Sequence, residues 1–151
     1  MNDREFNELE KIRKCLKTKR DRIDELEDKI KEIRSEKSET IAPLKAELEE
    51  KTAELLKDKD KRASYDITNQ KDWEKKIKRD LVSAKQNHIN DVSDDFDILI
   101  NQCNDEISEL RKDIKDLEME HANKLAYYSQ VETQKVNIDF NVKDLVESSS
   151  K

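Results

Sequence analysis

The side chains best suited to chemistry in this sequence are two histidines and two cysteines. His88 and His121 both fall on one apolar stripe of an expected long helix. As ligands of one metal ion they would have to converge, but the helix between them would hold them about 50 Å apart. We therefore predict seam histidines, packed or half exposed, and no metal site.

Cys15 and Cys103 are the only pair that could form a disulfide. In an antiparallel hairpin whose bend centres near residue 67, Cys15 would lie opposite residue 119 and Cys103 opposite residue 31. The two sulfurs would then be about 24 Å apart, too far for a bond. We expect two reduced cytosolic thiols, with Cys103 in the seam between the helices.

The acidic stretch DVSDDFDILINQCNDE is the third candidate for ligand chemistry. It holds no base, and its carboxylates are Asp91, Asp94, Asp95, Asp97, Asp105 and Glu106. A calcium loop needs a bend, usually at glycine, and the chain has no glycine. The stretch is therefore either a solvated face or a docking surface for a basic partner helix, because unpaired charge of one sign steers association.

Catalysis finds no support in the residue types. Without glycine the chain cannot form the Gly-rich loops that hold phosphates. No serine, histidine and carboxylate have a reason to converge, and a helical hairpin offers no concave pocket. We predict a protein that is not an enzyme and needs no cofactor.

The elements that would position these residues are two long helices. Charged residues make up 45% of the chain and apolar residues 33%, yet the apolar ones recur with helical period. The first stripe is Leu9, Ile12, Leu16, Ile23, Leu26, Ile30, Ile33, Ile41, Leu44, Leu48 and Leu55. The second is Trp73, Ile77, Leu81, Ala84, His88, Val92, Phe96, Leu99, Cys103, Ile107, Leu110, Ile114, Leu117, His121, Leu125 and Tyr128.

The stripes predict an all-α fold, an antiparallel helical hairpin or coiled coil over residues 1–132. Its first arm covers about 2–62, its bend about 63–72 and its second arm about 73–132, each arm being about 90 Å long. Asn2 and Glu5 fit an N-cap with a capping box. Because the first stripe slips between Ile33 and Ile41 and Pro43 follows, we expect a kink or short break near Ser38 to Pro43.

Residues 133–151 form a C-terminal tail that we expect to be flexible or strand-like. In VNIDFNV, apolar Val136, Ile138, Phe140 and Val142 alternate with polar residues, as in a half-buried strand. The spacing of Ile138, Val142 and Leu145 also fits a helical continuation. Strand, helix and disorder all remain open for this segment.

The basic run KIRKCLKTKRDR, Lys11 to Arg22, resembles a nucleic-acid-binding arm in charge alone. The chain is acidic overall, at −6, and no aromatic residues interleave with the bases. In the hairpin the run would face Asp113, Asp116, Glu118 and Glu120, which can neutralise it. We therefore predict structural or partner-docking charge and no nucleic-acid binding.

No apolar run is long enough for a transmembrane helix or a signal-peptide core. We expect a cytoplasmic protein without membrane insertion. Export without a cleaved signal peptide is the alternative open to it.

A long helical hairpin with Trp73 at the bend and YSQVE, Tyr128 to Glu132, near the end of the second arm resembles the WXG100 family of type VII secretion and the helical accessory proteins of LXG toxins. Tyr128 and Glu132 match the family's Y-x-x-x-[D/E] export signature, and Phe140 with Asp144 fits an aromatic version of it. Trp73 is followed by Glu74 and Lys75, so the W-x-G glycine is absent, which favours the accessory proteins.

The resemblance implies a non-enzymatic adaptor or targeting chaperone. It would pack against the helical N-terminal region of a larger client such as an LXG toxin, together with a second small helical protein, and would present the export signature. The alternative is a coiled-coil assembly or stalk subunit, of the kind found in flagellar or type III export, that forms homo-oligomers. Trp73 could equally be a ring that closes the hairpin, and Tyr128 a seam residue.

Overall fold

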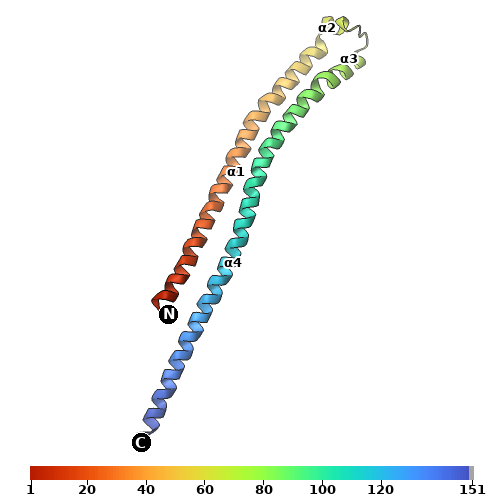
Figure 1. The fold of residues 1–151 in the computed structure, drawn as a ribbon. Helices are drawn as coiled ribbons and strands as arrows, with labels where there is room; N and C mark the ends of the chain where they lie inside the picture. Colours follow the sequence, from red (N-terminus) through yellow and green to blue (C-terminus); the bar gives the residue numbers. More distant parts are fainter. Residues whose placement is uncertain (150–151) are drawn as a thin grey trace. The chain divides into compact units, whose positions relative to one another are not determined.

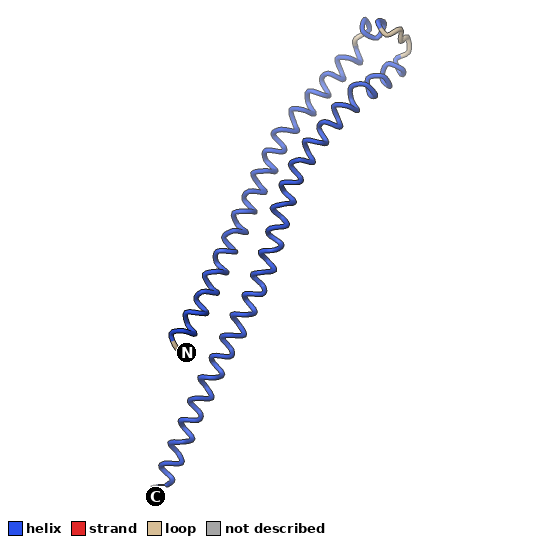
Figure 2. The backbone as a smooth tube through the Cα atoms, in the orientation of Figure 1, coloured by secondary structure: helices blue, strands red, loops and turns tan. Residues whose placement is uncertain are grey.

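The fold is an all-α helical hairpin, as the two stripes predict. The computed structural model describes the backbone of residues 1–149 and the side chains of residues 1–132 and 134. The elements are α1 (Asp3–Lys57), α2 (Lys59–Ser64), α3 (Gln70–Ile77), the π-helical turn η1 (Lys78–Val82) and α4 (Ser83–Ser149). Figure 2 shows helix along almost the whole described chain and no strand.

Two compact units make up the chain. The terminal unit contains Met1–Leu26 and Glu106–Lys151, and the loop unit contains Glu27–Asp105. In each unit a segment of α1 lies beside a segment of α4 and runs antiparallel to it (Figure 1). In the terminal unit this direction is visible in the contacts, because Glu8 bonds to Tyr128 whereas Arg20 bonds to Glu118.

The core of each unit is a single apolar seam. In the terminal unit Leu9, Ile12, Leu16, Ile23 and Leu26 are buried with Ile107 and Ile114. In the loop unit the buried side chains are Ile30, Ile33, Ile41, Leu48, Trp73, Ile77, Ile89, Ile100 and Cys103. Each fully buried aliphatic side chain contributes about 1.5–3 kcal/mol, and no polar or charged side chain among the described residues is buried.

Of the kink or short break predicted near Ser38 to Pro43, the break is wrong, because α1 continues through these residues, and the kink stays a prediction. Pro43 is exposed, whereas Ile41 and Leu48 on either side of it are buried. The hydrogen bond that proline removes therefore belongs to the solvent side, where water can replace it, and the seam keeps its packing.

The second stripe is shifted at two positions, so part of its prediction is wrong. Ile89 is buried and His88 exposed, and Ile100 is buried and Leu99 exposed. The shift at Ile89 is caused by η1, which precedes it. There the Ser83 backbone N–H donates to the carbonyl of Lys78, five residues back, so the turn contains one extra residue. Ala84 is likewise exposed.

Of the three alternatives left open for Val136 to Val142, the backbone takes the helix, because it belongs to α4, which runs to Ser149. This is the continuation that the spacing of Ile138, Val142 and Leu145 allows. Extending an existing helix adds one hydrogen bond per residue without a new nucleus, whereas a strand would need a neighbour to pair with. The side chains of this segment lie outside the described residues.

The start of α1 matches its prediction. Asn2 Oδ1 accepts a hydrogen bond from the Glu5 backbone N–H at 2.9 Å, as an N-cap does. None of the described helices has an apolar stretch that would let it cross a lipid bilayer.

Candidate interaction surfaces

Trp73 closes the loop end of the hairpin from inside. Its ring is 2% exposed, and its indole N–H donates to the Leu55 carbonyl at 2.7 Å. The Tyr65 ring lies 6.0 Å away, and the Lys76 ammonium sits 4.6 Å above the centre of that ring. The buried ring has both an apolar enclosure and a hydrogen-bond partner in its own unit, which is what a structural tryptophan requires.

The chain turns at this end without glycine. Asp66 takes the left-handed conformation, with φ of 56°, and its backbone N–H donates to the Ala63 carbonyl at 2.9 Å. Aspartate tolerates this conformation better than most residues. Asn69 then caps α3 by accepting from the Lys71 backbone N–H at 2.8 Å, so Trp73 enters the seam from the first turn of a capped helix.

Tyr128 contacts the N-terminal part of α1, and Glu132 contacts Met1 just before that helix. The Tyr128 hydroxyl donates to Glu8 Oε2, and the Met1 ammonium donates to Glu132 Oε1. The hydrogen bond to the Glu8 carboxylate raises the pKa of Tyr128 to about 12, and the same bond lowers the pKa of Glu8. A hollow of about 300 Å³ lies between them, lined by Met1, Asn2, Glu5, Tyr128, Val131 and Glu132.

The aromatic version of the signature is Phe140 with Asp144. The side chains of Phe140 and Asp144 lie outside the described residues, although both residues belong to α4 by backbone. Their role in partner binding stays a prediction, as it does for Trp73, Tyr128 and Glu132.

The basic run Lys11 to Arg22 faces carboxylates of α4, as predicted. Arg20 pairs with Glu118 at 2.6 Å and Lys19 with Asp113 at 3.5 Å. Arg22 pairs with Glu106 at 3.1 Å, which the sequence reasoning did not include. All three pairs lie within the terminal unit and join its two helices.

Neither the histidines nor the cysteines assemble a site among the described residues. His88 is exposed and His121 half-buried, and no group of three or more ligand side chains that could hold a metal ion is found there. Cys15 is exposed and Cys103 buried in the seam, and both are free thiols.

The acidic stretch divides into paired and unpaired carboxylates. Asp97 accepts from Lys37 and Glu106 from Arg22. In contrast, Asp91, Asp94, Asp95 and Asp105 are exposed and form no ion pair with any described residue. Asp91, Asp95, Ile98 and Asp105 recur at helical spacing on one side of α4, and Leu99 adjoins them.

We call this set of five the acidic face. Ile98 is 54% exposed and Leu99 47% exposed, so two large apolar side chains stand in water among three unpaired carboxylates. Single exposed apolar residues are normal, but an adjacent pair with charge of one sign around it is the composition of a helix-binding surface.

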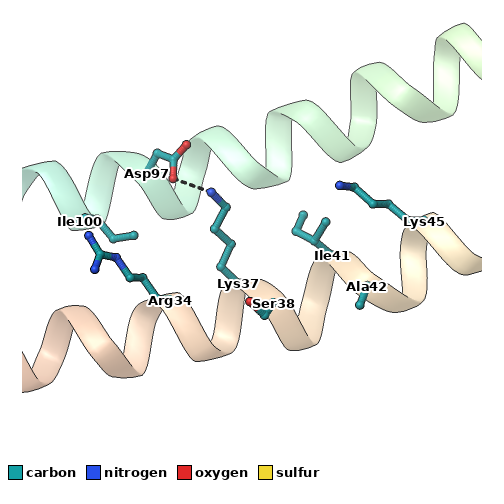
Figure 3. A pocket seen from close by; sticks show the side chains of 8 residues that line it. All are labelled: Arg34, Lys37, Ser38, Ile41, Ala42, Lys45, Asp97 and Ile100. Atoms are coloured by element: carbon teal, nitrogen blue, oxygen red, sulfur yellow. Dashed lines mark hydrogen bonds and ion pairs between the residues drawn. The ribbon is translucent and has the colours of Figure 1, made fainter.

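A basic hollow lies on a flank of the loop unit, between α1 and α4 (Figure 3). It measures about 620 Å³ and is lined by Arg34, Lys37, Ser38, Ile41, Ala42, Lys45, Asp97 and Ile100. Arg34, Lys37 and Lys45 extend from α1 toward α4, and the Lys37 ammonium donates to Asp97 at 2.8 Å. Arg34 and Lys45 form no ion pair with a described residue.

The sequence reasoning missed this hollow. Its signal is the series Arg34, Ser38, Ala42 and Lys45, spaced four, four and three, which places two small residues between two long cations on one helix face. Lys37 falls where the first apolar stripe slips between Ile33 and Ile41, at a position that the helical spacing would give to an apolar residue. The structure shows how the seam accepts it, since the ammonium at the end of the long side chain reaches the Asp97 carboxylate.

Comparisons with protein-family models, with curated proteins and with solved structures yield no match.

Proposed function

We propose that this chain is a non-enzymatic adaptor that binds a basic amphipathic helix of a larger client protein on its acidic face. The observation that carries the proposal is the exposed pair Ile98 and Leu99 among Asp91, Asp95 and Asp105, none of which has an ion-pair partner among the described residues. Apolar contact would provide affinity, and the carboxylates would set register and partner choice.

The apolar stripes are already buried against each other, so the acidic face is the better place for a client to bind. In both units the stripe of α1 is buried with the stripe of α4. A client that packed against a seam would have to separate the two arms and expose side chains such as Leu26, which is 1% exposed. The acidic face can be covered without that cost.

The resemblance to the accessory proteins of LXG toxins supports a more specific client, the helical N-terminal region of such a toxin in a type VII secretion system. In that role Tyr128 and Glu132 would be read by the export machinery. Tyr128 bonds to Glu8 and Glu132 to Met1 in the free protein, so recognition would have to exchange these bonds for bonds to the receptor.

The test compares two charge-reversed variants expressed at native level. In the first, Asp91→Lys, Asp95→Lys, Asp105→Lys and Ile98→Ser remove the acidic face. In the matched control, Asp24→Lys, Glu36→Lys and Glu50→Lys make the same charge change at exposed α1 positions. Affinity purification with mass spectrometry identifies the client, and titration of the purified client against each variant gives its affinity.

We expect the control to bind the client like wild type and the acidic-face variant to bind at least about a hundredfold more weakly. Equal binding by both variants would refute the proposal. The secretion role is tested separately by Tyr128→Ala, which should abolish client export and leave client binding intact.

The alternative, a coiled-coil assembly or stalk subunit, predicts homo-oligomers in place of a client complex. The observation that favours it is the basic hollow, where Arg34 and Lys45 form no ion pair with a described residue and so can bind a carboxylate of a second copy.

A further inference from the structure

The basic hollow brings two unpaired cations to the edges of a small-residue gap. Arg34 and Lys45 bound the gap, and exposed Ser38 and Ala42 lie between them. Asp97 neutralises Lys37 only, so the hollow keeps an uncompensated positive charge. A helix that packs here can approach closely, because the gap has no large side chain, and it would bring its own carboxylate to the two cations.

The α4 side of the same flank carries short polar side chains and one such carboxylate. Asn90, Asp94, Asp97, Asn101 and Asn104 are spaced four, three, four and three, so they form one stripe on α4 next to the hollow. Asp94 is exposed and forms no ion pair with a described residue. The flank therefore shows free positive charge on α1 and free negative charge on α4.

The antiparallel register of the loop unit places Asp94 of α4 at a level between Arg34 and Lys45 of α1. Because Lys37 contacts Asp97 in an antiparallel pair of helices, Asp94 lies level with residue 40. Residue 40 is almost midway between Arg34 and Lys45, about 9 Å from one and about 8 Å from the other along the axis. A long cation and an aspartate that point toward each other can span such offsets when the helices pack closely.

We infer that a second copy of this chain docks on the flank, with its Asp94 between Arg34 and Lys45 of the first and the reciprocal contact made by symmetry. A two-fold axis parallel to the helices places α4 of the second copy over α1 of the first at unchanged level, so opposite charges meet. An axis across the flank would place α1 over α1 and bring the cations together. The interface leaves Asp95, Ile98 and Leu99 uncovered, whereas Asp105, eleven residues from Asp94, lies on nearly the same line of α4 and adjoins it. The inference rests on the charges of the flank and not on the proposed function.

Charge exchange between two variants tests the inference on the full chain. One variant carries Arg34→Glu and Lys45→Glu, and the other carries Asp94→Lys. The matched controls are Lys29→Glu with Lys59→Glu, and Asp95→Lys, which change charge equally at exposed positions away from the flank. Sedimentation equilibrium from about 1 µM to about 100 µM gives each dissociation constant, and circular dichroism shows that each variant remains helical.

We expect wild type and both controls to dimerise, and each flank variant alone to dimerise about tenfold or more weakly. A one-to-one mixture of the two flank variants should recover the wild-type affinity, because each hollow then meets a charge of opposite sign. A monomeric wild type, dimers that survive both reversals, or a mixture that fails to recover would each overturn the inference. A monomeric wild type whose hollow variant loses client affinity would assign the hollow to a client carboxylate instead.

Discussion

The terminal unit and the loop unit differ in how their charges are paired. In the terminal unit Lys19, Arg20 and Arg22 of α1 pair with carboxylates of α4, and Glu8 bonds to Tyr128. In the loop unit Lys37 of α1 pairs with Asp97 of α4. Arg34, Lys45 and Asp94 there pair with no described residue.

The charged residues of the two units therefore have different roles. Those of the terminal unit hold α1 and α4 in register, whereas the unpaired ones of the loop unit are available to bind a partner. Pairs across the terminal unit fix which residues of α1 and α4 lie opposite each other. Exposed unpaired charge on the loop unit is satisfied only by water in the free chain, and a partner of opposite sign can replace that water at small cost. The loop unit is therefore the region where both proposed contacts fall.

The largest effect should come from the residue that closes the loop unit. Trp73→Ala removes a 2% exposed ring and its bond to the Leu55 carbonyl, and we expect it to lower the free energy of unfolding by about 3–5 kcal/mol. Urea denaturation followed by circular dichroism measures this. The control Tyr65→Ala removes a ring that is 53% exposed and should cost about 1 kcal/mol or less. Equal losses would mean that Trp73 faces outward in solution.

The shift of the second stripe gives the next largest effect. Ile89→Ala should cost about 2–4 kcal/mol, because Ile89 is 3% exposed and packs with Ile41 and Leu48. His88→Ala should change the free energy of unfolding by about 0.5 kcal/mol or less, because His88 is exposed. Urea denaturation of both variants shows whether Ile89 or His88 faces the seam. The opposite order would place His88 in the seam and remove the π-helical turn.

Helical spacing predicted the class of fold, the antiparallel arrangement and most of the seam. It could not predict the extra residue in η1, because a single π-helical turn leaves no repeating pattern in the sequence. The spacing therefore placed His88 in the seam, where the structure has Ile89. Between Leu99 and Ile100 the pattern has two apolar choices, and only packing selects Ile100. The acidic face was visible in sequence, whereas the hollow depends on which cations find partners across the seam.

A smaller effect should follow from neutralising the paired charges of the terminal unit. Asp113→Asn with Glu118→Gln removes the partners of Lys19 and Arg20. We expect hydrogen-exchange protection of residues 5–26 and 106–130 to fall by about two- to fivefold at low salt, and less at 1 M salt, where charges are screened beyond about 3 Å.

The matched change in the loop unit is Asp91→Asn with Asp105→Asn. Because neither carboxylate has an ion-pair partner among the described residues, its protection should not fall at either salt concentration. Equal losses in the two variants would contradict the difference in pairing between the units.

The smallest effect concerns the titration of Tyr128. A chain with Tyr65→Phe and Tyr127→Phe leaves Tyr128 as the only tyrosine, and its tyrosinate absorbance should rise with a pKa of about 12. The neutral phenol is the form that donates to Glu8, so the stability it adds is complete below the ordinary tyrosine pKa of 10.0 and is lost as pH rises through about 12.

The same contact has an acid limit set by Glu8. Its pKa is lowered from 4.5, so the contribution of the carboxylate is complete above that value and is lost as pH falls through the depressed pKa. Glu8→Gln should return the tyrosinate midpoint toward 10.0, whereas Glu10→Gln, two residues further along α1, should leave it near 12. A midpoint near 10.0 in the otherwise unaltered chain would show that Tyr128 is not held by Glu8, and the hydroxyl would then be free for a receptor without any exchange of bonds.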